Sequence, residues 1–356
     1  MGYLRNAWYV GALSRELNEQ PLGRVILDES VVFFRAADGS PVAVADRCPH
    51  RFVPLSLGKV KHGELECGYH GLRFGRDGLC VANPHGNNAI PRGANLRHYP
   101  ALERYGFIWI WTGDIERADE SRMPVFPFLD SPDQFTAVHG YLPVAGNYQL
   151  VVDNLLDLSH VEFLHPMFSQ AEGVAGHRTE FFQDGDVVVA NRWKPNVPLH
   201  GLAGRLFWTS PSTRSDARSN MRWSAPSYLD FDLGATEVGA SAEDGICLPN
   251  AHLVTPETEF KSHYFWAVAR NRLLDDEAMS VRLHDVVDQI FRTEDGPIIE
   301  AQQRSMGLTS DLMALHPVTL DPDIPAMRAR RILARRIEEE HRASGRKDLG
   351  RASAVA

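Results

Sequence analysis

The sequence predicts an α+β protein with a small all-β domain at the N-terminus and a larger domain that contains helices. The chain has 356 residues, more than one hydrophobic core usually organises, so two domains are expected. Short β-branched and aromatic runs joined by Asp-Gly pairs fill residues 1–115. Beyond residue 150, polar residues recur at every third position of an apolar run, which indicates a helix.

The composition narrows the class of protein. Lys and Arg number 37 against 46 Asp and Glu, a formal charge of −9, which argues against a nucleic-acid partner. No apolar run approaches the roughly 18 residues that span a bilayer, and the N-terminus lacks signal-peptide features, so no membrane partner is expected. Only 4 Cys occur, which favours a reducing, cytoplasmic location.

The N-terminal all-β domain is expected over residues 1–115. Residues 31–46 form two apolar runs joined by Asp38-Gly39, which predicts a hairpin, and residues 73–83 repeat the pattern. Residues 105–113 predict a further strand. A stretch rich in Asp, Glu, Arg and Pro follows and predicts a linker over 116–134.

Two loops of this domain each combine one Cys with one His. Cys48 and His50 form C-x-H, and after sixteen residues Cys67 and His70 form C-x-x-H. This donor set suits Zn²⁺ or a [2Fe–2S] cluster. Zinc fingers usually pair Cys with Cys, whereas one of each per loop suits a cluster with both Cys on one iron and both His on the other. Zinc, or unrelated buried Cys and His, remain the alternatives.

A second metal site is expected in the larger domain. Asn154, Asp157 and His160 are spaced by three residues in an apolar run, and polar groups on a buried helix face are costly unless paired or liganded. His165 lies about 140° around an ideal helix from His160, so a π-type widening or a helix end beside Pro166 must bring them together. Two His and a carboxylate would form the facial triad of non-haem Fe(II) enzymes. A pair of satisfied core histidines is the alternative.

The motifs CPHRFVPLSLG, CGYHGLRF, NYQLVVDNLLDLSH and HLVTPETE resemble those of the Rieske non-haem iron oxygenases, in particular the oxygenase subunits of vanillate and dicamba O-demethylases. Respiratory Rieske proteins carry an additional Cys in each loop, which is missing here. The resemblance implies a Rieske [2Fe-2S] cluster, a mononuclear non-haem Fe(II) and a homotrimer. It also implies a helix-grip-like catalytic domain, a curved antiparallel sheet with helices, over 135–330. Residues 331–356 then form a C-terminal helix and a flexible tail.

The resemblance also assigns roles to single residues. The family has an Asp in a late helix, which makes Asp295 the expected third iron ligand, with Glu294 and Glu162 as rivals. The Gly-Pro pair after Asp295 is expected to break that helix. In the family, the residue at Asp157 bridges a Rieske His, here His70, to a ligand His of the neighbouring subunit.

Two residues are candidates for substrate contact. Residues 223–234 alternate apolar and acidic positions, which predicts a strand. In dicamba O-demethylase, which this chain resembles, the position of Asp230 is an Asn. That Asn, together with a His at the position of His252, holds the carboxylate of the substrate. An ionised Asp would repel a carboxylate, so a phenol, a hydroxyl or an amine is expected instead. The alternative is that Asp230 merely faces solvent.

The implied function is that of a terminal oxygenase component. The chain has no dinucleotide-binding or phosphate-binding Gly-rich loop, so a separate reductase, with or without a ferredoxin, must supply electrons. O2 and a methoxylated aromatic substrate would then yield a phenol and formaldehyde. The alternatives are N-demethylation, ring hydroxylation, or an electron carrier without oxygenase activity. Basic residues near the cluster loops could steer an acidic redox partner: Arg51, Lys59, Lys61, Arg73 and Arg76.

Overall fold

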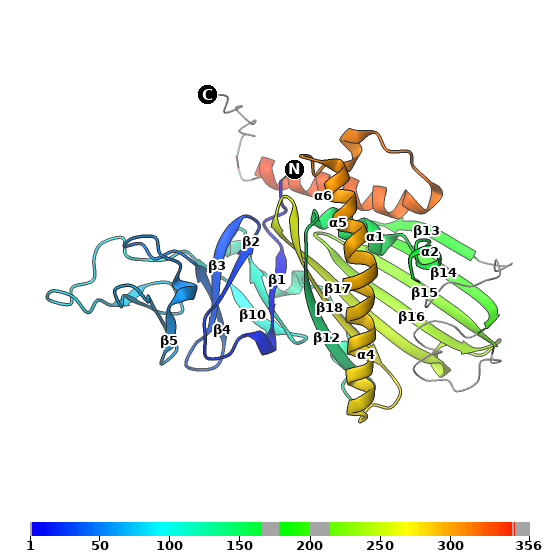
Figure 1. Ribbon diagram of the computed structural model, residues 1–356, viewed down its shortest axis with the longest axis horizontal. Helices are drawn as coiled ribbons and strands as arrows, with labels where there is room; N and C mark the ends of the chain where they lie inside the picture. Colours follow the sequence, from blue (N-terminus) through cyan, green and yellow to red (C-terminus); the bar gives the residue numbers. More distant parts are fainter. Residues whose placement is uncertain (1, 166–177, 199–213, 344, 346–356) are drawn as a thin grey trace.

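A computed structural model describes residues 2–165, 178–198, 214–343 and 345. The molecule is elongated, with the N-terminal domain at one end and the larger domain at the other (Figure 1). Pro166 and the expected tail beyond 345 lie outside the described residues. Among the described helices, none is both long enough and apolar enough to cross a membrane.

The N-terminal domain consists of three small antiparallel sheets, in the orders β1-β11-β10, β2-β3-β4-β9 and β5-β6-β7-β8. The expected hairpin at 31–46 is confirmed, because Val31–Arg35 pairs with Pro41–Ala45. The strands are β1 Trp8–Leu13, β2 Leu22–Ile26, β3 Glu29–Arg35, β4 Pro41–Ala45, β5 Lys59–Lys61, β6 Glu64–Glu66, β7 Arg73–Phe74, β8 Cys80–Ala82, β9 His98–Tyr99, β10 Ala101–Arg104 and β11 Phe107–Trp111.

The larger domain is built on a seven-stranded antiparallel sheet in the order β12-β18-β17-β16-β15-β14-β13. Its strands are β12 Thr136–Val144, β13 Arg178–Asp184, β14 Val187–Pro198, β15 Arg214–Ser224, β16 Tyr228–Glu237, β17 Ile246–Thr258 and β18 Lys261–Arg270. Gly140 of β12 faces Trp266 of β18, and a Cβ at this position would lie 2.0 Å from the indole ring. The sheet therefore requires glycine here to let the fully buried Trp266 pack.

Helices cover one face of this sheet. They are α1 Tyr148–Leu156, α2 Val161–Leu164, α4 Glu277–Ile290, α5 Gly296–Met306 and α6 Ile324–Ala343. A π-helical turn, η7 (Phe291–Asp295), connects α4 directly to α5. The expected break after Asp295 is therefore a local widening, and the helical backbone continues through the Gly-Pro pair, which occupies the first turn of α5, where proline is tolerated.

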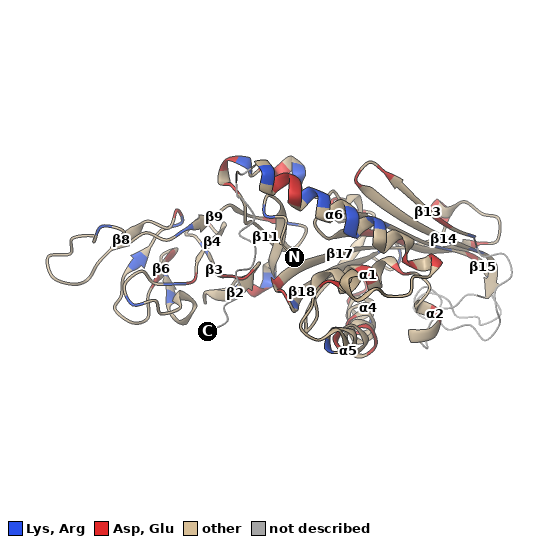
Figure 2. Cartoon of the chain, turned by 90° about the horizontal axis from the view of Figure 1, so that it is seen from above, with Lys and Arg blue, Asp and Glu red and all other residues tan. Residues whose placement is uncertain are grey.

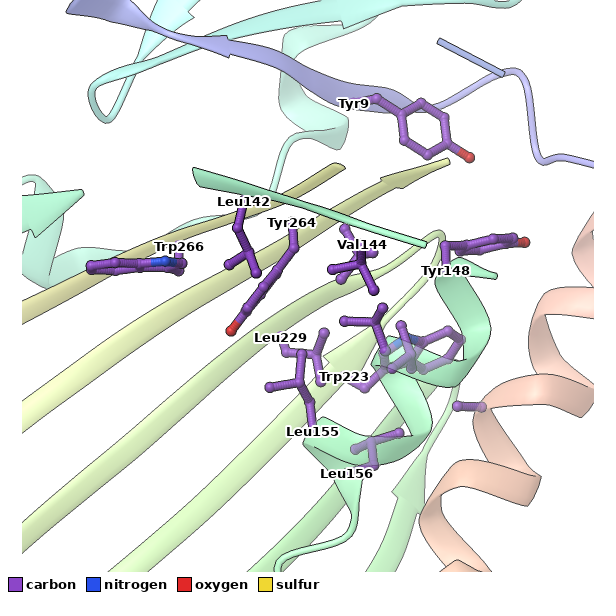
Figure 3. Packing of buried hydrophobic residues seen from close by; sticks show 14 of the residues in the cluster. Tyr9, Leu142, Val144, Tyr148, Leu155, Leu156, Trp223, Leu229, Tyr264 and Trp266 are labelled. Atoms are coloured by element: carbon purple, nitrogen blue, oxygen red, sulfur yellow. The ribbon is translucent and has the colours of Figure 1, made fainter. Parts of the chain in front are cut away.

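Helix α1 is attached to the sheet by its apolar side. Leu155 and Leu156 pack with Trp223 of β15 and Leu229 of β16 in one buried cluster (Figure 3). Each fully buried side chain of this kind stabilises the fold by about 1.5–3 kcal/mol. Helix α6 is fixed to α1 from the other side, because Arg330 forms an ion pair with Asp153. Helix α1 is thereby held between sheet and α6.

The opposite face of the sheet packs against the N-terminal domain. Trp8 and Trp109 share a buried aromatic cluster with Tyr228 and Phe265 of the sheet. Tyr228 donates a hydrogen bond to the Trp8 carbonyl at 2.5 Å. The expected linker at 116–134 contains three short 3-10 turns, and its Phe126 is buried in the same cluster. The two domains therefore share a continuous core.

One expected boundary needs correction. Residues 135–330 were assigned to the catalytic domain and 331–356 to a terminal helix, but α6 begins at Ile324 and runs through residue 331 without a break. Pro325 stands in the first turn, where its missing N–H costs no hydrogen bond. The described terminal helix therefore starts seven residues earlier than the boundary at 331.

Candidate active site

The four cluster candidates of the N-terminal domain come together at the tips of two loops. The loops are closed by equivalent turns, in which Phe52 N donates to Cys48 O at 2.8 Å and Gly71 N donates to Cys67 O at 3.0 Å. Gly71 has a φ of +72°, which favours glycine. The matching turns present one Cys and one His from each loop to the same point.

The side chains at this point suit a cluster. Cys48 and Cys67 are both buried, and the rings of His50 and His70 lie with centroids 4.5 Å apart. Burial raises the pKa of the Cys48 thiol, and the adjacent Cys67 adds to the effect, so two thiolates here require the charge compensation that a bound cation provides. Among the described residues, His70 Nδ1 is buried without a hydrogen-bond partner. Desolvation lowers the pKa of His70, so a neutral imidazole nitrogen is available as a ligand.

The candidate residues of the larger domain converge on a second point. His160 Nε2 lies 3.2 Å from His165 Nε2, and each lies 3.4 Å from Asp295 Oδ1. One ligand atom from each residue lies within 4.8 Å of the others. The His pair converges because the helix is interrupted: α1 ends at Leu156, and His160 and His165 flank the short helix α2. The expected helix end therefore brings His160 and His165 together.

Neighbouring groups fix these three side chains. Asn154 Nδ2 donates to Asp295 Oδ1 at 3.1 Å, and His165 Nδ1 contacts Glu294 Oε2 at 2.6 Å. His160 Nδ1 bonds to the Asp157 carbonyl. Burial lowers the pKa of His160, but the nearby Asp295 carboxylate outweighs it and the pKa is raised overall. A bound cation would replace the shared proton among these groups.

The two rival ligands have other partners. Glu294 contacts the far nitrogen of His165, so it supports the ring rather than joining the three grouped atoms. Glu162 Oε1 accepts from Arg192 Nη2 at 2.6 Å and from Lys194 Nζ at 2.8 Å. Asp295 is therefore the carboxylate that joins the histidines.

A cavity opens beside the three grouped side chains. Its volume is about 200 Å³, comparable to the cavity of roughly 150 Å³ that holds a benzene ring. Apolar side chains form most of its described wall: Leu155, Leu158, Val161, Val197, Met221, Phe231, Leu233, Val287, Ile290 and Phe291. The rest of the described lining is polar and includes the three grouped residues, His252 and the cations of β14 and β15. A mainly apolar wall with several placed polar groups is typical of a site for a small molecule.

His252 reaches this cavity and Asp230 does not. His252 lines the wall and shares a 2.7 Å hydrogen bond with the Tyr264 hydroxyl, and burial lowers its pKa to about 3, so its imidazole is neutral. On β16, the cavity face carries Phe231 and Leu233. Asp230 points to the other face by strand alternation, where burial raises its pKa to about 6. The structure therefore does not bring Asp230 to the cavity.

Two further expectations concern charge. Asp157 caps α1, and its Oδ1 accepts from Ser159 N at 2.8 Å. The basic residues near the cluster loops are largely paired with acids. Lys59 and Lys61 contact Glu66, Arg73 contacts Glu64, and Arg76 contacts Asp38. The local field available to steer a redox partner is weaker than the sequence suggested.

Comparison with known families explains both centres. A model of the Rieske [2Fe-2S] domain matches residues 7–100, and a model of the vanillate O-demethylase oxygenase C-terminal domain matches residues 144–339. The chain belongs to the Rieske non-haem iron oxygenases. This Rieske oxygenase carries a [2Fe-2S] cluster and a mononuclear non-haem iron as cofactors. It is the oxygenase component of a multi-component system, so its electrons come from a partner protein.

Individual relatives cover nearly the whole Rieske oxygenase chain. The oxygenase component of dicamba O-demethylase from Stenotrophomonas maltophilia is 38% identical over 332 residues, 93% of this chain and 97% of the relative. The oxygenase component of chloroacetanilide N-alkylformylase from Rhizorhabdus wittichii is 37% identical over 341 residues, 96% and 97% of the two chains. A crystal structure of dicamba monooxygenase bound to 3,6-dichlorosalicylic acid matches with a TM-score of 0.87 at 35% identity, covering 96% and 99%.

Some functional residues escaped the sequence reasoning. Arg192, Lys194 and Asn250 line the cavity. Glu294, expected only as a rival ligand, instead contacts the candidate ligand His165. The strand pattern of residues 187–198 places Arg192 and Lys194 on one face, which was the available signal. Nothing in the sequence indicates that this face is the one toward the cavity.

Proposed function

We propose that this Rieske oxygenase O-demethylates a methoxylated aromatic compound and releases a phenol and formaldehyde. The observation that carries the proposal is the grouping of His160, His165 and Asp295 at the wall of an apolar cavity sized for one substituted ring. Two imidazoles and one carboxylate leave open positions on an iron, which suits reactions of O2. Relatives that act on dicamba and vanillate support the reaction type.

We assign the ligands from the same geometry. His160, His165 and Asp295 would hold the mononuclear iron, while Cys48, His50, Cys67 and His70 would hold the [2Fe-2S] cluster. When bound, these centres supply electron transfer and O2 activation. Asn154 and Glu294 act through the ligands, because one donates to Asp295 and the other contacts His165.

The chain's own residues have simpler tasks in the reaction. Phe231 and Met221 offer apolar surface on which an aromatic ring can lie, and the enclosed wall excludes water from the reacting carbon. His252 stays neutral and offers a hydrogen bond to a substrate oxygen without adding charge. The phenol then leaves as the neutral or singly charged product that such a cavity tolerates.

The shape of the chain supports a homotrimer with electron transfer between subunits. The strands near the cluster loops and helix α2 lie at opposite ends of the molecule in both views (Figures 1 and 2). A cluster at one tip serves an iron at the far end best if it belongs to a neighbouring chain. Asp157, which follows the C-terminal end of α1 and is partly buried beside His160, would bridge to His70 of that neighbour. A reductase, with or without a ferredoxin, would reduce the cluster.

The test is turnover with a generic reductase on methoxylated benzoates, phenols and N-methyl compounds, with formaldehyde as the readout. Formaldehyde and the matching phenol are expected from methoxy compounds. Hydroxylated rings without formaldehyde would overturn the demethylase assignment. N-dealkylation is the second candidate, because a relative at 37% identity is an N-alkylformylase component.

Metal analysis distinguishes an oxygenase from an electron carrier. Fully loaded protein should hold three irons per chain, and His160→Ala should hold two while keeping the absorbance of the cluster. Two irons in the wild type, unchanged in the variant, would refute the iron site. Gel filtration of the loaded protein tests the trimer.

A further inference from the structure

Three cationic side chains stand in the described wall of the cavity: Arg192, Lys194 and Arg218. Arg218 forms an ion pair with Asp232 of the neighbouring strand β16, which leaves the two cations of β14 to account for. Strand β14 directs both Arg192 and Lys194 to the cavity. Arg192 is 9% exposed, and the Lys194 side chain is 14% exposed. Burying a charge is expensive unless it is paired or serves a ligand. Two such charges on adjacent positions of one strand face therefore need an explanation.

The described contacts show what these cations already do. Arg192 Nη1 donates to the Leu158 carbonyl at 2.8 Å, and Arg192 and Lys194 both donate to a single oxygen of Glu162. Burial lowers the pKa of Lys194, with Arg192 acting in the same direction and Glu162 against it. Among the described residues that line the cavity, Asp295 is the only carboxylate, and it belongs to the iron site.

Hydrogen bonds place the two cations in space beside the segment that carries His160. Arg192 contacts Leu158 and Glu162, the residues two before and two after His160. The cavity extends from there over β15 and β16 to His252 on β17. Three steps of about 4.8 Å between strands make a floor about 14 Å wide, enough for a ring with a substituent at each end.

We propose that Lys194, backed by Arg192, binds an anionic substituent of the aromatic substrate, such as a carboxylate or a sulfonate. This inference rests on the proposed function and adds a determinant of specificity to it. The ring lies on Met221 and Phe231, and the anion faces β14. Asp230 was expected to repel a substrate carboxylate. Its side chain lies on the other face of β16, so it does not face an anion bound in the cavity.

The experiment compares acids with their neutral amides. Equilibrium binding of the 2-, 3- and 4-methoxybenzoates, the matching benzenesulfonates and the matching benzamides is measured on anaerobic holoenzyme. The variant Lys194→Met removes the charge and keeps the chain length, and Lys261→Met at an exposed position is the matched control. The ratio of acid to amide affinity should fall about 10- to 100-fold in Lys194→Met, as expected for one charge-assisted hydrogen bond. The control should keep the ratio.

Three outcomes would overturn the subsite. The first is an equal change for acids and amides, and the second is a wild type that binds none of the acids or sulfonates. The third is a loss of iron in Lys194→Met, which would show that the cation only positions the segment around His160. Binding is measured without turnover, so the subsite can fail while formaldehyde release continues. Conversely, the proposed demethylation can fail while the acid preference remains.

Discussion

The hydrogen bond between Glu294 and His165 makes a quantitative prediction about iron affinity. Glu294 Oε2 lies 2.6 Å from His165 Nδ1, and the His165 side chain is 4% exposed. A carboxylate at this distance fixes the ring and raises the basicity of the other nitrogen, which faces the metal. Glu294→Gln keeps the size and one acceptor but removes the charge. Loss of such a partner typically weakens metal binding 10- to 100-fold, about 1.4–2.7 kcal/mol.

Competition with a chelator measures this change. Iron released from the mononuclear site is titrated while the absorbance of the [2Fe-2S] cluster serves as an internal standard in the same sample. Glu294→Gln should lie at the lower end of the range, because the amide oxygen still accepts a hydrogen bond. Glu294→Ala should lie at the upper end, because the ring nitrogen then has no side-chain acceptor from residue 294.

A matched control separates charge from position. Glu277→Gln changes an exposed carboxylate on α4 and should leave iron affinity unchanged. Wild-type iron affinity in Glu294→Gln and Glu294→Ala would refute the argument, because the contact would then contribute nothing to the ligand. An equal loss in the control would point to a general effect on the helix instead.

Three further predictions concern stability. Arg330→Met leaves the buried Asp153 carboxylate unpaired, so the free energy of unfolding in denaturant should fall by about 3–5 kcal/mol; a loss below 1 kcal/mol would contradict it. Burial holds the pKa of His252 at about 3, below the ~6.5 of an unfolded chain. The unfolded state therefore binds one more proton than the folded state at pH values between about 3 and 6.5. Stability falls as the pH is lowered through this window, by up to about 1.4 kcal/mol per pH unit. His252→Gln should show a shallower fall below pH 6 and no difference in slope above pH 8; identical slopes would contradict the buried neutral imidazole. Gly140→Ala places a Cβ 2.0 Å from Trp266 and should destabilise the fold by about 1–3 kcal/mol, seen as a lower Tm; an unchanged Tm would contradict the predicted clash.

The cluster loops were predictable because their information is local. Each loop holds its Cys and His two or three residues apart, and the tight turns that present them need only Gly or a tolerated positive φ nearby. The resulting cofactor expectation is confirmed by the family match. The grouping of His160 with His165 was also expected from a helix end. The distant partner Asp295 depended on the family resemblance.

Other features depended on tertiary packing that no local pattern contains. Alternation along β16 shows that Asp230 and Phe231 occupy opposite faces, but both faces are covered, one by helices and one by the N-terminal domain. The pattern therefore could not indicate which face borders the cavity. The terminal helix α6 was predictable, because Glu and Arg are mixed at helical spacing along it, although the domain boundary placed at 331 fell inside it. The role of Glu294 depends on a helix geometry that sequence periodicity does not encode.

The π-helical turn η7 has a consequence for how the site could be lost or altered. In a regular α-helix, consecutive side chains point about 100° apart. Here Glu294 and Asp295 contact opposite nitrogens of the same His165 ring. The turn accommodates one residue more than an α-helical turn would. A deletion of a single residue within 291–295 would restore the ordinary helical phase and rotate the ligand and its support away from each other. The positions of Asp295 and Glu294 on either side of the His165 ring thus depend on the length of this one turn.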